Sequence, residues 1–347
     1  MPDSLSSIVR SGAALGMLLI AAVAMGATED LGDGFRDHGV ATPVSNHRGT
    51  VATQDGQGHG VVLIWLFDNR GAYALLMVDV DTGTSRQIAT PFPTSGDCPF
   101  ASLLSSRNRY YTQFGSHFAE FDPVKGAFTF WKKTTPRMAM SMTEDDAGQI
   151  WAVSYPNSGV VCFNPETQEL RDYGWVHKET WPQYQRYAAT DDAGWFYFGI
   201  GNTTTQIVAL EPVTGMATPI LPENERIRGS ASVYRDMDGK VYGCNGSDKW
   251  YELHRGKAKK IPKPQKPQRK PIIAGSQSLV HRVFPDGRRL TVCDTVERYL
   301  IVTGPKDAKP KKVTFDYTSE GAHIMGVAAA PDDTICGGTA FPMRFFS

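Results

Sequence analysis

An acidic turn that ends in glycine recurs along the chain, and each copy is followed by a short segment of apolar and aromatic residues. The clearest copies are residues 145–151, 191–197 and 236–242, which read DDAGQIW, DDAGWFY and DMDGKVY. Their glycines are 46 and 45 residues apart. This spacing is too long for a hairpin or a helical repeat and is typical of one blade of a β-propeller. The repeat therefore predicts an all-β fold built from blades.

Weaker copies of the turn extend the series toward both ends of the chain. They lie at residues 57–59 and 107–109 upstream and at residues 285–287 and 331–333 downstream, which makes seven units. The 347 residues allow about 50 for each unit, enough for four strands. The 34 Gly and 22 Pro suit tight turns, because Gly accepts positive φ and Pro fixes φ. We predict a seven-bladed β-propeller with four-stranded antiparallel blades.

The last unit offers only three strands, at residues 324–329, 334–338 and 343–346. Residues 35–40 (FRDHGV) resemble residues 170–175 (LRDYGW), the expected outer strand of the third blade. A ring with an unpaired edge would be prone to aggregation. We therefore expect residues near 34–42 to complete the last blade. The alternative is that the chain is a piece of a longer protein.

The amino terminus has the pattern of a secretory signal peptide over residues 1–27. Arg10 precedes the apolar run 13–24, and small residues follow at Gly26 and Ala27. The run is short for a membrane span, so we expect cleavage, no stable membrane insertion, and a secreted or periplasmic β-propeller domain at residues 28–347. An uncleaved membrane tether is the alternative.

The balance of charged residues narrows the function classes further. The 36 basic and 36 acidic side chains cancel, so we predict no general nucleic-acid binding. One local exception, residues 255–271, carries eight Lys or Arg and four Pro, and we predict a solvated, extended inter-blade loop there. Its alternative role is a tether for an anionic polymer or a protein partner.

Five cysteines without C-x-x-C spacing give no support to a zinc ribbon or a thioredoxin-like motif. Cys98 is expected in a loop, and the others are expected as small apolar residues of strands. These four are Cys162, Cys244, Cys293 and Cys336. One disulfide could form in an exported protein, but the spacing does not identify the pair.

Counting back from each turn identifies polar residues at the start of every innermost strand. The count starts from the residue at the glycine position of each turn and goes back eleven residues, or ten in the last unit. It reaches His47, Asp97, Arg137, Gln183, Arg228, Ser276 and His323. Loops at the same mouth of the central channel add Tyr155 and Asn202, and Arg186 lies near Gln183. The predicted ligand-binding residues are Arg137, Arg186, Arg228, Asp97, Gln183 and Asn202. Because arginines pair with carboxylate, sulfate or phosphate, we expect an acidic oligosaccharide or polysaccharide, with an anionic peptide as the alternative.

Catalysis would need a base beside such an anion. Elimination from a uronate requires neutralisation of the carboxylate and removal of the adjacent proton, for which His47, His323 or Tyr155 are the candidates. In a closed ring, the two histidines could share a divalent metal with Asp97. The alternative is that the histidines only hydrogen-bond loop carbonyls. The serine-hydrolase elbow, the Walker loop and the dinucleotide fingerprint are all missing from the sequence.

Residues 145–152 followed by residues 159–167 (GVVCFNPET) resemble the blades of the virginiamycin B lyase, SMP-30/gluconolactonase and YVTN-type propellers. The resemblance covers blades three to five well and the others loosely. It implies an exported or periplasmic propeller with its ligand at the central channel. The lactonase-like members hold a divalent metal in a carboxylate and amide cluster, and the streptogramin lyase uses a His/Glu cluster with magnesium. Neither cluster can be placed on this chain, so the resemblance transfers no mechanism.

Two functions follow from these observations. In the first, the protein is an exported binder of acidic carbohydrate or a polysaccharide lyase. In the second, it is a noncatalytic protein-interaction scaffold that uses its rim or its basic loop. The propeller fold itself supports either function.

Overall fold

The computed structural model describes residues 29–33, 35–37, 44–68, 73–94, 98–305, 309–319, 321–340 and 345–347. The predicted signal peptide at residues 1–27 therefore lies outside the described residues, as does Asp97. In the described part of the chain, no helix is long and apolar enough to cross a membrane. The chain divides into two compact units, residues 1–41 and 42–347.

The first unit contains one small sheet. Its strands β1 (Glu29–Gly32) and β2 (Phe35–Asp37) pair with each other in antiparallel fashion. β2 holds the described residues of the segment near 34–42 that was predicted to complete the last blade. In the structure these residues pair with β1, within this hairpin.

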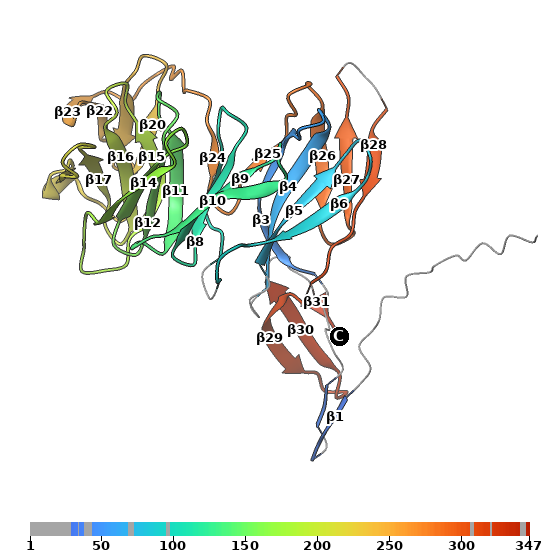
Figure 1. The fold of residues 1–347 in the computed structure, drawn as a ribbon. Coiled ribbons are helices and arrows are strands. Elements are labelled where there is room, and N and C mark those ends of the chain that lie inside the picture. Colours follow the sequence, from blue (N-terminus) through green and yellow to red (C-terminus); the bar gives the residue numbers. More distant parts are fainter. Residues whose placement is uncertain are drawn as a thin grey trace, which may run out of the picture. The chain divides into compact units, whose positions relative to one another are not determined.

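The described strands of the second unit form seven sheets, in which strands that follow one another along the chain pair in antiparallel fashion (Figure 1). The first sheet contains β3 (Asn46–Gln54), β4 (Gly60–Phe67), β5 (Tyr73–Asp79) and β6 (Ser85–Ala89). The second contains β7 (Ser102–Leu104), β8 (Tyr110–Phe114), β9 (His117–Asp122) and β10 (Ala127–Lys133), and the third contains β11 (Met138–Glu144), β12 (Ile150–Tyr155), β13 (Gly159–Asn164) and β14 (Glu169–Trp175). The fourth contains β15 (Tyr184–Thr190), β16 (Phe196–Asn202), β17 (Gln206–Leu210) and β18 (Ala217–Pro219), with the short β19 (Gly229–Ser230) beside β16.

The remaining three sheets follow the same order along the chain. The fifth contains β20 (Ser232–Arg235), β21 (Val241–Cys244), β22 (Trp250–His254) and β23 (Lys257–Ile261). The sixth contains β26 (Arg289–Asp294), β27 (Tyr299–Thr303) and β28 (Lys311–Thr314), and the seventh contains β29 (His323–Ala329), β30 (Ile335–Ala340) and β31 (Phe345–Phe346). This arrangement confirms the all-β fold, with four consecutive antiparallel strands in each of the first five sheets and three described strands in each of the last two.

The repeated turn has the same backbone conformation in every unit. The residue at the glycine position has a positive φ, between 55° and 93°, in all seven described turns. These residues are Gly58, Asn108, Gly148, Gly194, Gly239, Gly287 and Asp333. In the third turn, one oxygen of Asp145 accepts hydrogen bonds from the turn amides, and the other accepts the indole N–H of Trp151 at 3.0 Å. Asp191 binds its own turn and the Tyr197 hydroxyl in the same way. The acidic residue therefore joins the turn to the aromatic strand that follows it.

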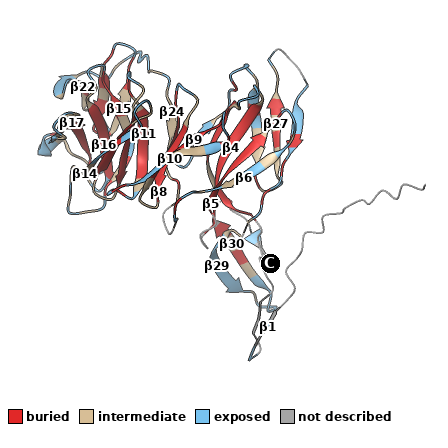
Figure 2. Cartoon of the chain, in the orientation of Figure 1, coloured by how far each residue is buried: buried red, intermediate tan, exposed pale blue. Residues whose placement is uncertain are grey.

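Consecutive sheets bury their faces against each other from the first sheet to the fifth. Trp65 and Tyr110 lie in the core shared by sheets one and two, and Trp151 and Phe196 lie in the core shared by sheets three and four. The buried residues of Figure 2 follow these strands. The sixth sheet packs against the first, where Leu290 lies in the same cluster as Val62.

The sixth sheet lacks the inner strand that the repeat predicts. The residues around Ser276, where that strand should begin, instead form β24 (Ile273–Gly275), which pairs with β7, and β25 (Val280–His281), which runs parallel to β3. The free edges of β7 and β3 offer unpaired backbone N–H and C=O groups, and this segment satisfies some of them. The prediction of four strands for the sixth blade is therefore wrong for the described residues.

The seventh sheet is covered least. Every residue of β29 is exposed, and no described residue of this sheet belongs to one of the five core clusters. Because the sixth sheet already occupies the adjacent face of the first, the structure does not confirm a closed ring of seven blades.

Two further predictions meet different outcomes. Residues 257–261 of the basic segment form β23, the outer strand of the fifth sheet, so only the rest of the basic segment is a loop.

All five cysteines are free thiols, and the four that were expected in strands do lie in strands.

Candidate functional site

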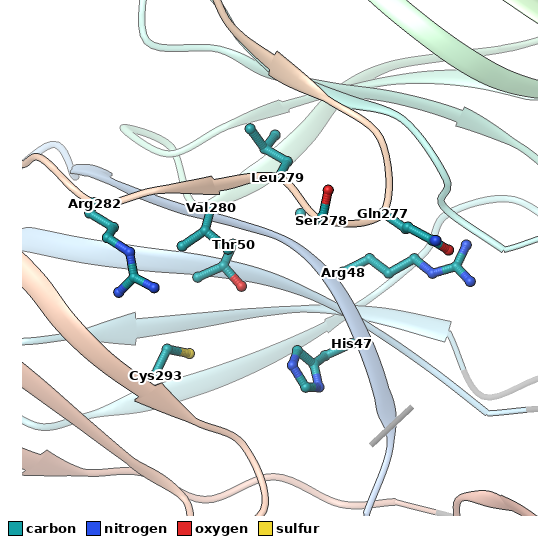
Figure 3. Close-up of a pocket in the computed structure, with 10 residues that line it drawn as sticks. His47, Arg48, Thr50, Gln277, Ser278, Leu279, Val280, Arg282 and Cys293 are labelled. Atoms are coloured by element: carbon teal, nitrogen blue, oxygen red, sulfur yellow. The ribbon is translucent and has the colours of Figure 1, made fainter. Parts of the chain in front are cut away.

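Two cavities adjoin at Ser278, which lines both of them. The first, here called the histidine cavity, measures about 390 Å³ and lies between β3, the segment around β25, and β26. Figure 3 shows side chains from these three elements around it, among them His47, Thr50 and Cys293. The second, here called the arginine cavity, measures about 470 Å³ and is lined by β11, β15, β20 and the segment 269–278. The first strands of several sheets therefore build both cavities.

β-Bulges in these first strands orient the side chains at the cavity walls. The pairing register shifts between Arg48 and Val51 in β3, and between Tyr184 and Tyr187 in β15. A bulge bends its strand and redirects the neighbouring side chains. The bulge in β3 contains Gly49, whose φ is +58° and whose carbonyl accepts a hydrogen bond from the Tyr110 hydroxyl. A side chain at this position would collide with Tyr110, so the bulge requires glycine.

His47 is the titratable group of the histidine cavity. Its Nδ1 lies 2.8 Å from the hydroxyl of Thr295. Burial lowers the pKa of His47, and the nearby carboxylate of Asp294 opposes this effect only in part. The ring is therefore neutral at pH 7, and a neutral imidazole has one nitrogen that can accept a proton. This arrangement is compatible with the role of a base.

Two arginines and a thiol complete the chemistry of this cavity. Arg48 donates a hydrogen bond of 2.9 Å to the Sγ of Cys98 and stacks over Phe67 at 5.1 Å. Arg282 donates through one nitrogen to the carbonyls of Leu290 and Thr291. Burial raises the pKa of Cys293 to about 12, so it is a protonated thiol at pH 7 and a poor nucleophile.

Four cationic side chains line the arginine cavity, and none of its described lining residues is acidic. They are Arg186, Arg235, Arg269 and Lys270. Asp146, outside this lining, pairs with two of them, at 2.8 Å from Arg235 and 2.6 Å from Lys270. Arg269 stacks over Tyr234 at 4.4 Å, and Arg186 lies 5.8 Å from the ring of Tyr184. Two guanidinium groups are thus held by aromatic rings, which leaves their N–H groups for an anion.

The structure brings some of the predicted mouth residues together. The ring centroids of Tyr155 and Tyr184 are 5.2 Å apart, and Arg186 lies over the ring of Tyr184, so the three side chains form one group. Burial, together with the neighbouring Tyr184, raises the pKa of Tyr155. Asn202 and Arg228 line a separate, open cavity of about 420 Å³ together with Thr203. The mouth of the fourth sheet therefore carries two small polar groups of residues.

Other predicted residues are placed apart from these groups. Gln183 is fully buried, and it bonds Ser158 and the carbonyl of His177, so it offers no surface to a ligand. Arg137 is exposed just before β11, and His323 is exposed at the start of β29. Neither of these two is among the residues that line the histidine or the arginine cavity.

The predicted metal site of His47, His323 and Asp97 includes one residue outside the described part, and it remains a prediction. Within the described residues, one group of three has metal-ligand geometry, namely Asp55, His59 and Asp79. His59 bonds Asp79 at 2.9 Å, and both carboxylates also accept hydrogen bonds from amides of their own turns. This group therefore serves as a clamp between two turns.

Sequence reasoning missed four residues of the cavities, namely Arg235, Arg269, Lys270 and Arg282. Arg269 and Lys270 are the last two cationic residues of the basic segment, and Arg235 directly precedes the acidic turn of the fifth unit. Their convergence could not be deduced, because it depends on where the segment 262–278 crosses the first strands.

No known protein-family model and no curated protein sequence matches the chain. Among solved structures, a streptogramin B lyase is similar, with 14% identity over 88% of this chain and 94% of that chain and a TM-score of 0.42. A protein assigned as a gluconolactonase has 11% identity over 80% and 92% of the two chains and a TM-score of 0.33. A hydrazine synthase of Kuenenia stuttgartiensis has 10% identity over 91% and 99%, with a TM-score of 0.40. The first two names match the propeller group that the repeat resembles. Likenesses at this level carry no functional inference.

Proposed function

We propose that this protein is an exported β-propeller that binds an anionic ligand, an acidic carbohydrate, in the arginine cavity. The observation that carries the proposal is the convergence of Arg186, Arg235, Arg269 and Lys270 on one cavity whose described lining residues include no carboxylate. Export is supported by the sequence pattern of residues 1–27.

Arg186 and Arg269 are the residues best suited to hold the ligand. Both are exposed, whereas Arg235 is buried and committed to Asp146 and to backbone carbonyls. A guanidinium presents two parallel N–H groups that match a carboxylate or sulfate. Tyr234 and Tyr184 stack against the two guanidinium groups, so less side-chain freedom is lost on binding.

The adjoining histidine cavity supplies the groups that an elimination would need. His47, neutral at pH 7, would take the proton beside the uronate carboxylate, and Arg48 or Arg282 would stabilise the negative charge that develops. The carbon–oxygen bond to the leaving sugar then breaks, and a carbon–carbon double bond forms. Lyase activity is the catalytic form of the proposed function.

The proposal is tested by a thermal-shift screen of the full chain against acidic oligosaccharides, because a ligand that binds the folded state raises its melting temperature. We expect a shift that is lost in the variant R186Q/R269Q and retained in R137Q, which removes an exposed arginine outside the cavity. Turnover would release an unsaturated product that absorbs ultraviolet light, and the variant H47Q should not form this product. Equal loss in R186Q/R269Q and R137Q would contradict the proposed site, and no shift with any acidic sugar would favour the noncatalytic scaffold.

A further inference from the structure

Residues 257–270, here called the cationic strap, connect the outer edge of the fifth sheet to the arginine cavity. The strap begins as β23, paired with β22, and continues from Pro262 outside the strands, with a bend at Gln265 and Lys266. Its last two residues, Arg269 and Lys270, line the arginine cavity. The strap and the cavity are therefore one continuous basic surface.

Most of the charge of the strap is uncommitted. Lys257, Lys259, Lys263 and Lys266 are exposed, and none forms an ion pair with another described residue. Lys260 differs, since it pairs with Glu225. Unpaired lysines on an edge strand also prevent strand addition by another chain, so β23 alone has a sufficient structural explanation. The segment after β23 has no such explanation.

The segment after β23 has a regular spacing of charge. It reads KPQKPQR at residues 263–269, which places Lys263, Lys266 and Arg269 three residues apart. Three residues of a fully extended chain span at most about 10 Å, so neighbouring cations of this run lie no more than about 10 Å apart along the backbone. Pro262, Pro264 and Pro267 restrict the backbone in this run.

The strap is anchored at both ends. At the cavity end, the amide of Gln268 donates to the carboxylate of Asp236 at 2.8 Å, and its carbonyl accepts the amide of Met237 at 2.8 Å. The amide of Lys270 donates to the carbonyl of Arg235 at 3.0 Å. A tethered chain loses less conformational entropy on binding than a free one.

We propose that the ligand is a linear acidic polysaccharide that runs from the arginine cavity outward along the cationic strap. The inference rests on the proposed function, and it names the ligand as a polymer. A duplex nucleic acid carries a charge about every 1.7 Å, far denser than a run with one cation in every three residues. A polysaccharide with at most one carboxylate per sugar is the sparser polyanion and the better match.

The test compares the affinities of the protein for a galacturonate trimer and for a long galacturonate polymer. The affinities are measured by calorimetry on the whole protein chain at two salt concentrations. For the wild type, we expect the polymer to bind more tightly than the trimer and to lose more affinity at high salt. The variant K263Q/K266Q should lose about tenfold in affinity for the polymer and keep its affinity for the trimer. The matched control K132Q/K133Q removes two exposed lysines from β10, the outer strand of the second sheet, and should bind both ligands like the wild type.

Each other outcome overturns a defined part of the scheme. If neither ligand binds the wild type, the proposed function fails together with the inference. If the trimer binds and the polymer binds no more tightly, or if the control loses as much affinity as K263Q/K266Q, only the strap inference fails. Tighter strap-dependent binding of duplex DNA than of polygalacturonate would also overturn it. Circular dichroism measures the melting temperatures of both variants. Melting temperatures equal to that of the wild type exclude unfolding as the cause of a loss of affinity.

Discussion

The third and seventh sheets are built from the same local pattern and differ in what covers them. Their first strands, β11 and β29, both carry a bulge after the second residue, and both lead into a turn with a left-handed residue, Gly148 or Asp333. The second strand then begins with isoleucine in each case. Yet Ile150 is fully buried, whereas Ile335 is 52% exposed.

The difference arises from the neighbouring sheets. Ile150 lies in a cluster with Tyr111 and Phe118 of the second sheet, and Trp151 stacks on Phe196 of the fourth sheet at 5.1 Å. The seventh sheet has no described core of this kind, and Met325 and Val327 are 67% and 58% exposed. The comparison teaches that the repeat specifies a hairpin and its turn, while burial of its apolar residues depends on a packing partner.

The largest expected effect comes from the two matched isoleucines. Ile150→Ala should lower the free energy of unfolding by about 2–5 kcal/mol, because it removes a fully buried side chain from a shared core. Ile335→Ala should cost less than about 1 kcal/mol, since half of its surface is exposed. Urea denaturation of both variants provides the measurement. Similar losses would mean that the seventh sheet is packed against a partner in solution.

The acidic turn residue provides a second, smaller difference between the two sheets. The third sheet has Asp145 at the position where the seventh has Ala330, although both turns keep the same pair of backbone hydrogen bonds. Asp145→Ala should cost about 1–3 kcal/mol, because it leaves the buried indole N–H of Trp151 without its acceptor.

The control for this substitution is Asp332→Ala, which removes one hydrogen bond to an exposed turn amide of the seventh unit. We expect a change below about 0.5 kcal/mol in the same urea experiment. A loss as large as that of Asp145→Ala would show that the turns contribute equally and that packing is not the source of the difference.

The smallest effect tests whether the sixth sheet, and not the seventh, adjoins the first. Arg288 binds Asp81 through two nitrogens, one at 3.0 Å, and lowers the pKa of Asp81 to about 2. A carboxyl group with a depressed pKa contributes stability above its unfolded pKa, near 4, and this contribution is lost as the pH falls toward 2. Arg288→Ala should therefore cost about 1 kcal/mol at pH 7 and progressively less below pH 4.

Arg289→Ala is the matched control, because Arg289 is exposed and forms no ion pair with another described residue. It should leave the pH dependence of unfolding unchanged. If Arg288→Ala behaves like this control, the first and sixth sheets are not neighbours in solution.

The candidate site was predictable in part. The count back from the turns located His47 at a cavity wall, and Arg186 was recognised near the start of an inner strand. Gln183 stays a predicted ligand-binding residue, which the structure places in a fully buried position with a hydrogen bond from Ser158. The count could not find Arg235, Arg269 and Lys270 as a group, since they converge only where the segment after β23 crosses β20.

The sequence by itself determined the number and order of the turns, the four-stranded hairpin pattern and the basic, proline-rich segment. These features are local, because a residue with positive φ, an acidic clamp and alternating apolar side chains act within one unit. Only the tertiary structure decided that β24 and β25 join the edges of β7 and β3, that the sixth sheet packs on the first, and which cations share a cavity. These outcomes depend on competition among distant edges and faces for hydrogen bonds and apolar contacts, and such competition leaves no pattern within a single repeat.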